Sequence, residues 1–170
     1  MTGSLAGESP TVLTLGHSNR SFQEVLSLLT TFGVEILLDV RSRPHMNFYP
    51  DFSRRRMKMR LAAAGVIYIF MGDLLAEAPR QGDYRTRLGT VDSIRVELSD
   101  PFSRGLAWIL EECRHSRLCL FCAEAEPAGC HRHYLIGQNL LARGVRILHI
   151  LGSGQVEEAQ ADLYHRTPET

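Results

Sequence analysis

The sequence has no excess of charge of either sign and no long apolar run. Its 170 residues carry 19 basic and 19 acidic side chains, so no net field would recruit nucleic acid or an anionic membrane. The longest apolar stretches, such as residues 66–71, are far shorter than the ~20 residues that span a bilayer. We therefore expect a cytoplasmic protein with no membrane partner.

The first ten residues also lack the basic start and apolar core of a targeting signal. We expect a disordered leader over residues 1–10, a single α/β domain over residues 11–152 and a polar C-terminal tail over residues 153–170. Cysteine is scarce, and all four cysteines fall between positions 113 and 130. In a reducing compartment such a cluster indicates thiols, ligands or packing residues rather than a disulfide framework.

Apolar strands and amphipathic helices alternate along the chain, which predicts a three-layer α/β sandwich with a mostly parallel sheet of about five strands. Single glycines at 33, 65 and 144 each separate a helix from the strand that follows. The segment 73–99 has no clear period and is expected to be a surface excursion or lid. The predicted strands cover 11–15, 34–40, 66–70, 118–121 and 145–150, and the predicted helices begin near Ser21, Ser53, Asp100 (as a cap) and Cys130.

Nearly every unusual polar residue follows one of these strands. Because ligands bind beyond the carboxyl ends of the strands in open parallel sheets, these residues predict a small-molecule or anion site on one rim. They are His17 and Ser18 after the first strand, Asp39 and Arg41 at the second, Cys122 and Glu124 at the fourth, and Cys130, His131 and Arg132 at the start of the last helix.

Several of these residues have a purely structural alternative. Asp39 could pair with Arg41, His17 could hydrogen-bond its own loop, and Cys122 could be an inert core residue. Cys130 is different, because a thiol at a helix start beside histidine and arginine has a lowered pKa. We predict that Cys130 is the most reactive of the four thiols.

Three motifs together resemble a known family. They are TLGHSNRS, LLDVRSRP and CAEAEPAGCHRHYLIGQNLLARG, and the CAE followed by CHR is the specific part. In these motifs the chain, over residues 11–150, resembles the family catalogued as domain of unknown function 488. The resemblance implies an α/β fold, and the family name itself assigns no activity.

The leading functional hypothesis is an enzyme that acts on a small anionic substrate without a cofactor. Arg41, Arg132 and the helix N-terminus would hold the anion, with Ser18 and His131 beside it. Cys130 or Cys122 would be the nucleophile, Glu124 or His17 the acid/base, and Asp39 would orient Arg41. The phosphatase loop, in which five residues separate cysteine from arginine, is absent.

Two alternatives remain open. Cys122, Cys130 and His131, with His17 as a fourth ligand, could bind zinc, but neighbouring Cys130 and His131 are expected to point apart, so no metal is predicted. The segment 41–60 carries seven basic residues interleaved with aromatic ones, a pattern that suits a nucleic-acid accessory module. A neutral protein favours a solvated helix face over nucleic-acid binding, and the oligomeric state is left open.

Overall fold

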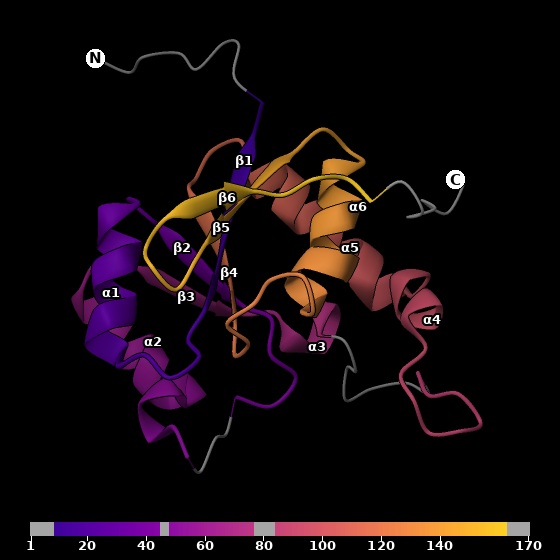
Figure 1. Cartoon of the computed structure of the whole chain (residues 1–170), viewed down its shortest axis with the longest axis horizontal. Coiled ribbons are helices and arrows are strands. Elements are labelled where there is room, and N and C mark those ends of the chain that lie inside the picture. The colour runs from indigo at the N-terminus through magenta and orange to yellow at the C-terminus, as the bar shows by residue number, and fades with distance from the viewer. Residues whose placement is uncertain (1–8, 45–47, 77–83, 163–170) are drawn as a thin grey trace.

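The computed structural model describes residues 9–44, 48–76 and 84–162, which form a sheet covered by helices on both faces (Figure 1). In these residues the sheet has six strands in the order β3-β2-β4-β1-β5-β6, all parallel except β6. The strands are β1 (Thr11–Gly16), β2 (Ile36–Asp39), β3 (Ile67–Phe70), β4 (Leu118–Cys122), β5 (Arg146–Ile150) and β6 (Val156–Glu158). The predicted α/β class is confirmed, with one strand more than expected.

The helices divide between the two faces of the sheet because neighbouring residues of a strand point to opposite sides. Val12 faces the cluster formed with α5 and α6, whereas Leu13 faces the cluster formed with α1 and α2. Figure 1 shows α1 and α2 on one side and α3 to α6 on the other. The helices are α1 (Phe22–Thr31), α2 (Arg54–Ala63), α3 (Gly72–Leu75), α4 (Ser93–Glu97), α5 (Asp100–Glu112) and α6 (Gln138–Leu141), with a 3₁₀ turn at Pro50–Phe52 and a π-helical turn at Arg132–Gly137 that leads into α6.

Local sequence signals explain most of the helix ends. Ser21 and Glu24 form a capping box at the start of α1, where a helix was predicted to begin. Gly33, Gly65 and Gly144 all have positive φ, as a glycine that ends a helix requires. One cap differs from the prediction, because Ser99 rather than Asp100 accepts the backbone N–H of residue 102 at the start of α5.

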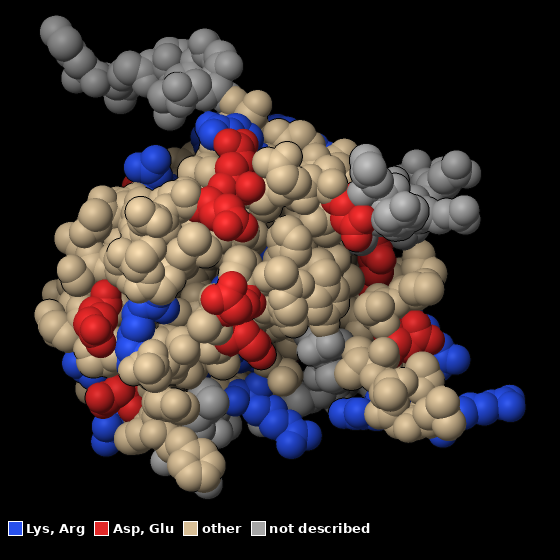
Figure 2. Space-filling view, in the orientation of Figure 1, with Lys and Arg blue, Asp and Glu red and all other residues tan. Residues whose placement is uncertain are grey.

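Parts of the expected domain organisation lie outside the described residues, namely residues 1–8 of the predicted leader, 77–83 of the predicted excursion and 163–170 of the predicted tail. The described part of the segment 73–99 contains most of α3 and all of α4, and Val96 of α4 is fully buried. No helix among the described residues is long and apolar enough to cross a membrane. Figure 2 shows acidic and basic side chains interspersed over one face of the molecule.

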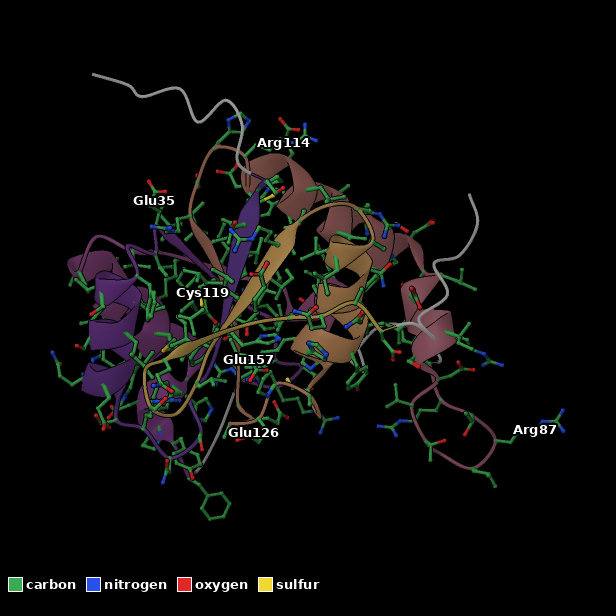
Figure 3. All side chains as sticks on the ribbon, turned by 45° about the horizontal axis from the view of Figure 1, so that its top comes forward. Glu35, Arg87, Arg114, Cys119, Glu126 and Glu157 are labelled. Atoms are coloured by element: carbon green, nitrogen blue, oxygen red, sulfur yellow. The ribbon has the colours of Figure 1, made fainter. Side chains whose placement is uncertain are left out.

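The carboxyl ends of β1, β2 and β4 meet at one end of the sheet. In Figure 3, Glu126 on the loop after β4 lies at the opposite end from Glu35 and Arg114, which precede β2 and β4. The loops after β1 and β4 stay paired, because the backbone N–H groups of His17 and Ser18 donate to the carbonyls of residues 122 and 123 at 3.0 and 2.9 Å. This shared rim carries the candidate site.

Candidate functional site

Two cysteines, a histidine and a glutamate form the centre of the rim. The Sγ of Cys122 lies 2.8 Å from Oε2 of Glu124, and the Sγ of Cys130 lies 3.2 Å from the same oxygen. Nδ1 of His131 is 3.8 Å from each sulfur. The ligand atoms of Cys122, Cys130 and His131 all lie within 4.8 Å of one another, so residues from β4 and from the start of the last helix converge on one point.

The backbone orients His131. Its Nε2 lies 2.9 Å from the carbonyl oxygen of Val40, which follows β2, and only an N–H can bond to that acceptor. In the neutral ring, Nδ1 therefore carries the lone pair that faces the two sulfurs. The expectation that Cys130 and His131 point apart is wrong, because the helix begins with a wide π-helical turn and both side chains face the same point.

Charge is distributed unequally between the two thiols. The hydrogen bond from Cys122, aided by His131 and Arg132 and opposed by burial, lowers the pKa of Cys130. The same hydrogen bond, together with burial and the carboxylate of Glu124, raises the pKa of Cys122. Burial opposes ionisation of Glu124, but the two S–H donors hold the pKa of its carboxyl below its ordinary value. The pair therefore favours a thiolate at Cys130 and a protonated thiol at Cys122.

An open pocket of about 160 Å³ lies against this centre. Cys122 contributes to the pocket wall, whereas Cys130 is only 1% exposed and does not line it. The exposed side chain of Arg43 stands at its rim. The full lining is Arg41, Ser42, Arg43, Cys122, Ala123, Glu124 and His131.

Asp39 and Arg41 form a buried ion pair beside the pocket. The carboxylate of Asp39 is fully buried and accepts Nε and Nη2 of Arg41 at 2.8 and 2.7 Å. It also accepts the hydroxyl of Tyr68 at 2.6 Å, and burial with this negative neighbour raises the pKa of Tyr68. Nη2 of Arg41 donates further to the carbonyl of Phe52 at 2.8 Å. The predicted pairing of Asp39 with Arg41 is present, and it ties β2 to β3 and to the segment before α2.

Arg132 is the largest fully buried side chain, and it bonds to the protein itself. Its guanidinium donates to the carbonyls of Glu124 and Ala125 at 2.9 and 3.1 Å and to the hydroxyl of Thr14 at 3.2 Å. Arg132 does not line the pocket. It therefore holds the loop after β4 in place, and its positive charge lies close enough to help lower the pKa of Cys130.

His17 is buried among aromatic rings, stacked on Phe52 with 4.4 Å between ring centroids. Its Nδ1 lies 2.9 Å from the carbonyl of Ser18, a residue held at positive φ. Nε2 of His17 has no hydrogen-bond partner among the described residues. Burial lowers the pKa of His17, so the ring is neutral and Nε2 is an acceptor. Neither His17 nor Ser18 lines the pocket.

Part of the basic and aromatic segment is used within the fold. Phe52 is buried, and the guanidinium groups of Arg54 and Arg60 lie over the rings of Phe70 and Phe22 at 4.3 and 3.7 Å. Phe48 is 90% exposed, and α2 still presents exposed basic residues to solvent. The nucleic-acid hypothesis for residues 41–60 stays a prediction.

Neither Tyr68 nor Arg43 was among the predicted site residues. Tyr68 lies inside a β-strand, where a tyrosine is ordinarily a packing residue, and only the pairing of β2 with β3 brings it to Asp39. Arg43 could have been identified from its place in the same polar run as Arg41.

Comparison with curated proteins and with solved structures found no match. A family described as domain of unknown function DUF488 matches residues 21–138. The matched region includes Asp39, Arg41 and the whole segment from Cys122 to Arg132, and it leaves His17 and Ser18 outside. Since the match covers more than half of the chain, the chain belongs to the DUF488 family.

Proposed function

We propose that the protein is a cysteine-dependent enzyme that binds a small anionic substrate in the pocket at the carboxyl ends of β2 and β4. One observation carries the proposal: two thiols within 4.8 Å of each other share a carboxylate and an imidazole nitrogen at the wall of an open pocket. An inert packing cysteine has no need of two proton acceptors, whereas a nucleophilic thiol needs at least one.

Each site residue has a role that its contacts support. Cys122 is the sulfur that a molecule in the pocket can reach, and Cys130 supplies negative charge through the hydrogen bond between the two thiols. Glu124 and the lone pair on Nδ1 of His131 accept and return protons. Asp39 and Arg132 are positioning residues that fix Arg41 and the loop after β4.

The charge around the pocket favours an anion on one side. The charge of Arg41 is balanced by Asp39, and the carboxylate of Glu124 is directed at the sulfurs. Arg43 also lines the pocket and is exposed, so its guanidinium can bond to a carboxylate or phosphate group. An anionic substrate would bind with its charge at Arg43 and its reactive atom at Cys122.

The test is site-resolved alkylation with iodoacetamide and with iodoacetate at neutral pH. We expect the pair Cys122 and Cys130 to label faster than Cys113 and Cys119, because Cys122 lines the pocket and the thiolate of Cys130 beside it can take its proton. The two remote thiols have no such neighbour, and burial raises the pKa of both, that of Cys119 to about 12. Arg43→Ala should slow the reaction of the anionic reagent more than that of the neutral one. Arg87→Ala, on an arm remote from the site (Figure 3), is the matched control. A pair that labels no faster than Cys113 would contradict the proposal.

The convergence of Cys130 and His131 favours a metal centre as the second candidate. For tetrahedral zinc, ordinary bond lengths place a thiolate sulfur and an imidazole nitrogen about 3.6 Å apart, and Nδ1 of His131 lies 3.8 Å from both sulfurs. The carbonyl that accepts the N–H of His131 is the outer contact that metal-binding histidines make. Near-stoichiometric zinc in protein purified without chelator, lost in Cys130→Ser, would favour this candidate over the nucleophilic thiol.

A further inference from the structure

The two sulfurs of the site have unequal access to the pocket. Both side chains are buried, Cys122 at 2% and Cys130 at 1% exposed, but only Cys122 lines the pocket wall. Both sulfurs lie within hydrogen-bonding distance of Oε2 of Glu124, and the two sulfurs are within 4.8 Å of each other. A reagent in the pocket therefore meets Cys122 first, and any group attached to Cys122 is placed next to Cys130.

The other two cysteines, both within the described residues, lack this arrangement. Cys119 is on the same strand as Cys122 but belongs to the opposite core cluster, where it donates only to a backbone carbonyl. Cys113 follows α5, near the other end of the sheet. A single pair of thiols, one reachable and one enclosed, is the arrangement that two-step thiol–disulfide exchange requires.

We propose that Cys122 and Cys130 form a dithiol centre that reduces a small anionic disulfide, with Cys122 as the attacking sulfur and Cys130 as the resolving sulfur. This inference rests on the proposed function, because it uses the same pocket and the same nucleophile, and it adds the substrate class and the reaction. The anionic group of the disulfide would bind at Arg43, and one of its sulfurs would lie against Cys122.

In the first step, the thiolate of Cys130 takes the proton of Cys122 while the sulfur of Cys122 attacks one sulfur of the bound disulfide. A bond forms between the two sulfurs, the S–S bond of the substrate breaks, and the first half leaves as a thiolate. The proton displaced from Cys122, held by Cys130, His131 or Glu124, neutralises that leaving thiolate. The product is a mixed disulfide on Cys122 and one molecule of free thiol.

In the second step, the thiolate of Cys130 attacks the sulfur of Cys122. The Cys122–Cys130 bond forms, the mixed disulfide breaks, and the second half leaves with the proton that Cys130 gave up. Two electrons and two protons pass from the protein to the substrate, so one disulfide is consumed and two thiols are released. Two proton acceptors stand beside the pair, one for each proton that moves.

The test uses oxidised glutathione, an anionic disulfide, on the reduced full-length protein, with an acid quench and peptide mapping under non-reducing conditions. The wild type should lose the free thiols of Cys122 and Cys130 and gain a disulfide between them. Cys130→Ser should stop at glutathione attached to Cys122, and Cys122→Ser should do neither. Cys113→Ser should behave as the wild type, and thermal unfolding of each variant shows that it is folded. Cys130→Ala repeats the trapping experiment if the serine variant does not fold.

Two results would overturn the inference and leave the proposed function standing. In one, glutathione stays attached to Cys122 in the wild type while Cys130 remains a free thiol. In the other, Cys122 reacts rapidly with iodoacetamide but not with oxidised glutathione. By contrast, a Cys122 and Cys130 pair that is inert to both reagents would remove the proposed function itself.

Discussion

The carboxylate of Asp39 holds several side chains in place beside the pocket. It is fully buried and accepts three side-chain hydrogen bonds, two from Arg41 and one from Tyr68, and the backbone N–H of Arg41 as well. Arg41 in turn lies over the ring of Phe121, 5.0 Å from its centroid. A buried charge that loses its partner is costly, so this pair determines stability as well as the shape of the pocket wall.

At the residue scale, Arg41→Ala should mainly lower stability, whereas Arg43→Ala should mainly slow the reaction with an anionic reagent. Removing Arg41 leaves Asp39 buried without its cation and should cost about 3–5 kcal/mol of unfolding free energy. Arg43 is exposed, and its loss should change stability by less than about 0.5 kcal/mol while slowing alkylation by iodoacetate. Urea unfolding measures the first effect and mass spectrometry the second. Equal stabilities for the two variants would show that the Asp39 pair does not carry the role given to it.

At the element scale, the loops after β1 and β4 approach too closely for a side chain at Gly16. A Cβ placed on Gly16 would lie 1.7 Å from the carbonyl oxygen of Glu124. That carbonyl also accepts a hydrogen bond from Arg132, so the contact is fixed from both sides. The protein's own backbone therefore fills the space beside Gly16.

Gly16→Ala should therefore displace the loop that carries Glu124. We expect a loss of about 1–3 kcal/mol in unfolding free energy, typical of overpacking. We also expect faster alkylation of Cys122, because the carboxylate that raises its pKa moves away. Gly129→Ala is the matched control, since nothing lies within 4 Å of its added Cβ in the same loop. If both variants label at the wild-type rate, the contact between the two loops does not position the site.

Helices and strands could be predicted from the sequence where buried apolar residues recur at a regular spacing. Elements without such a spacing could not be predicted. The core strands could be predicted from their apolar runs. The ends of three helices could be predicted because each has a glycine, the residue that adopts a positive φ most readily. Strand β6 could not, because all three of its residues are exposed. The rim could be predicted from topology, but not the convergence of Cys130 with His131, since a π-helical turn has no simple sequence signature.

At the scale of the whole molecule, a chain of buried polar groups links β1, β5 and the segment after β6. The side-chain amide of Gln138 donates to a backbone carbonyl and accepts a backbone N–H, which fixes its orientation. Its N–H therefore points at Nε2 of His133. Nδ1 of His133 then donates to Nε2 of His149 at 2.9 Å, and Nδ1 of His149 donates to the hydroxyl of Thr14 at 2.7 Å. In this order both imidazoles are neutral, and an added proton would place two donors face to face.

The lowered pKa values of three histidines determine whether stability rises or falls with pH. Burial, with the nearby charges of His133 and Arg132, lowers the pKa of His149 to about 4, against about 6.5 when unfolded. Burial also lowers the pKa of His133 and of His17. Below pH 6.5 the unfolded chain therefore binds more protons than the folded one, and stability falls. The pKa of His131 is raised despite its burial, so its contribution is already complete below pH 6.5 and changes only above it. The pKa of Cys130 is lowered to about 5, so protonation of its thiolate adds to the loss of stability on acidification.

We expect the free energy of unfolding to be highest near neutral pH and to decrease between pH 6.5 and 4, with His149 contributing up to about 1.4 kcal/mol per pH unit. His149→Gln removes the titrating ring but keeps an amide near the position of Nε2, so it should be less stable than the wild type at pH 7 and lose less stability on acidification. His115→Gln is the matched control, because His115 is exposed beside Glu111 and should leave the slope unchanged. Urea unfolding at several pH values measures the slope of unfolding free energy against pH for each variant. A slope in His149→Gln as steep as in the wild type would show that His149 and His133 are not the source of the acid sensitivity.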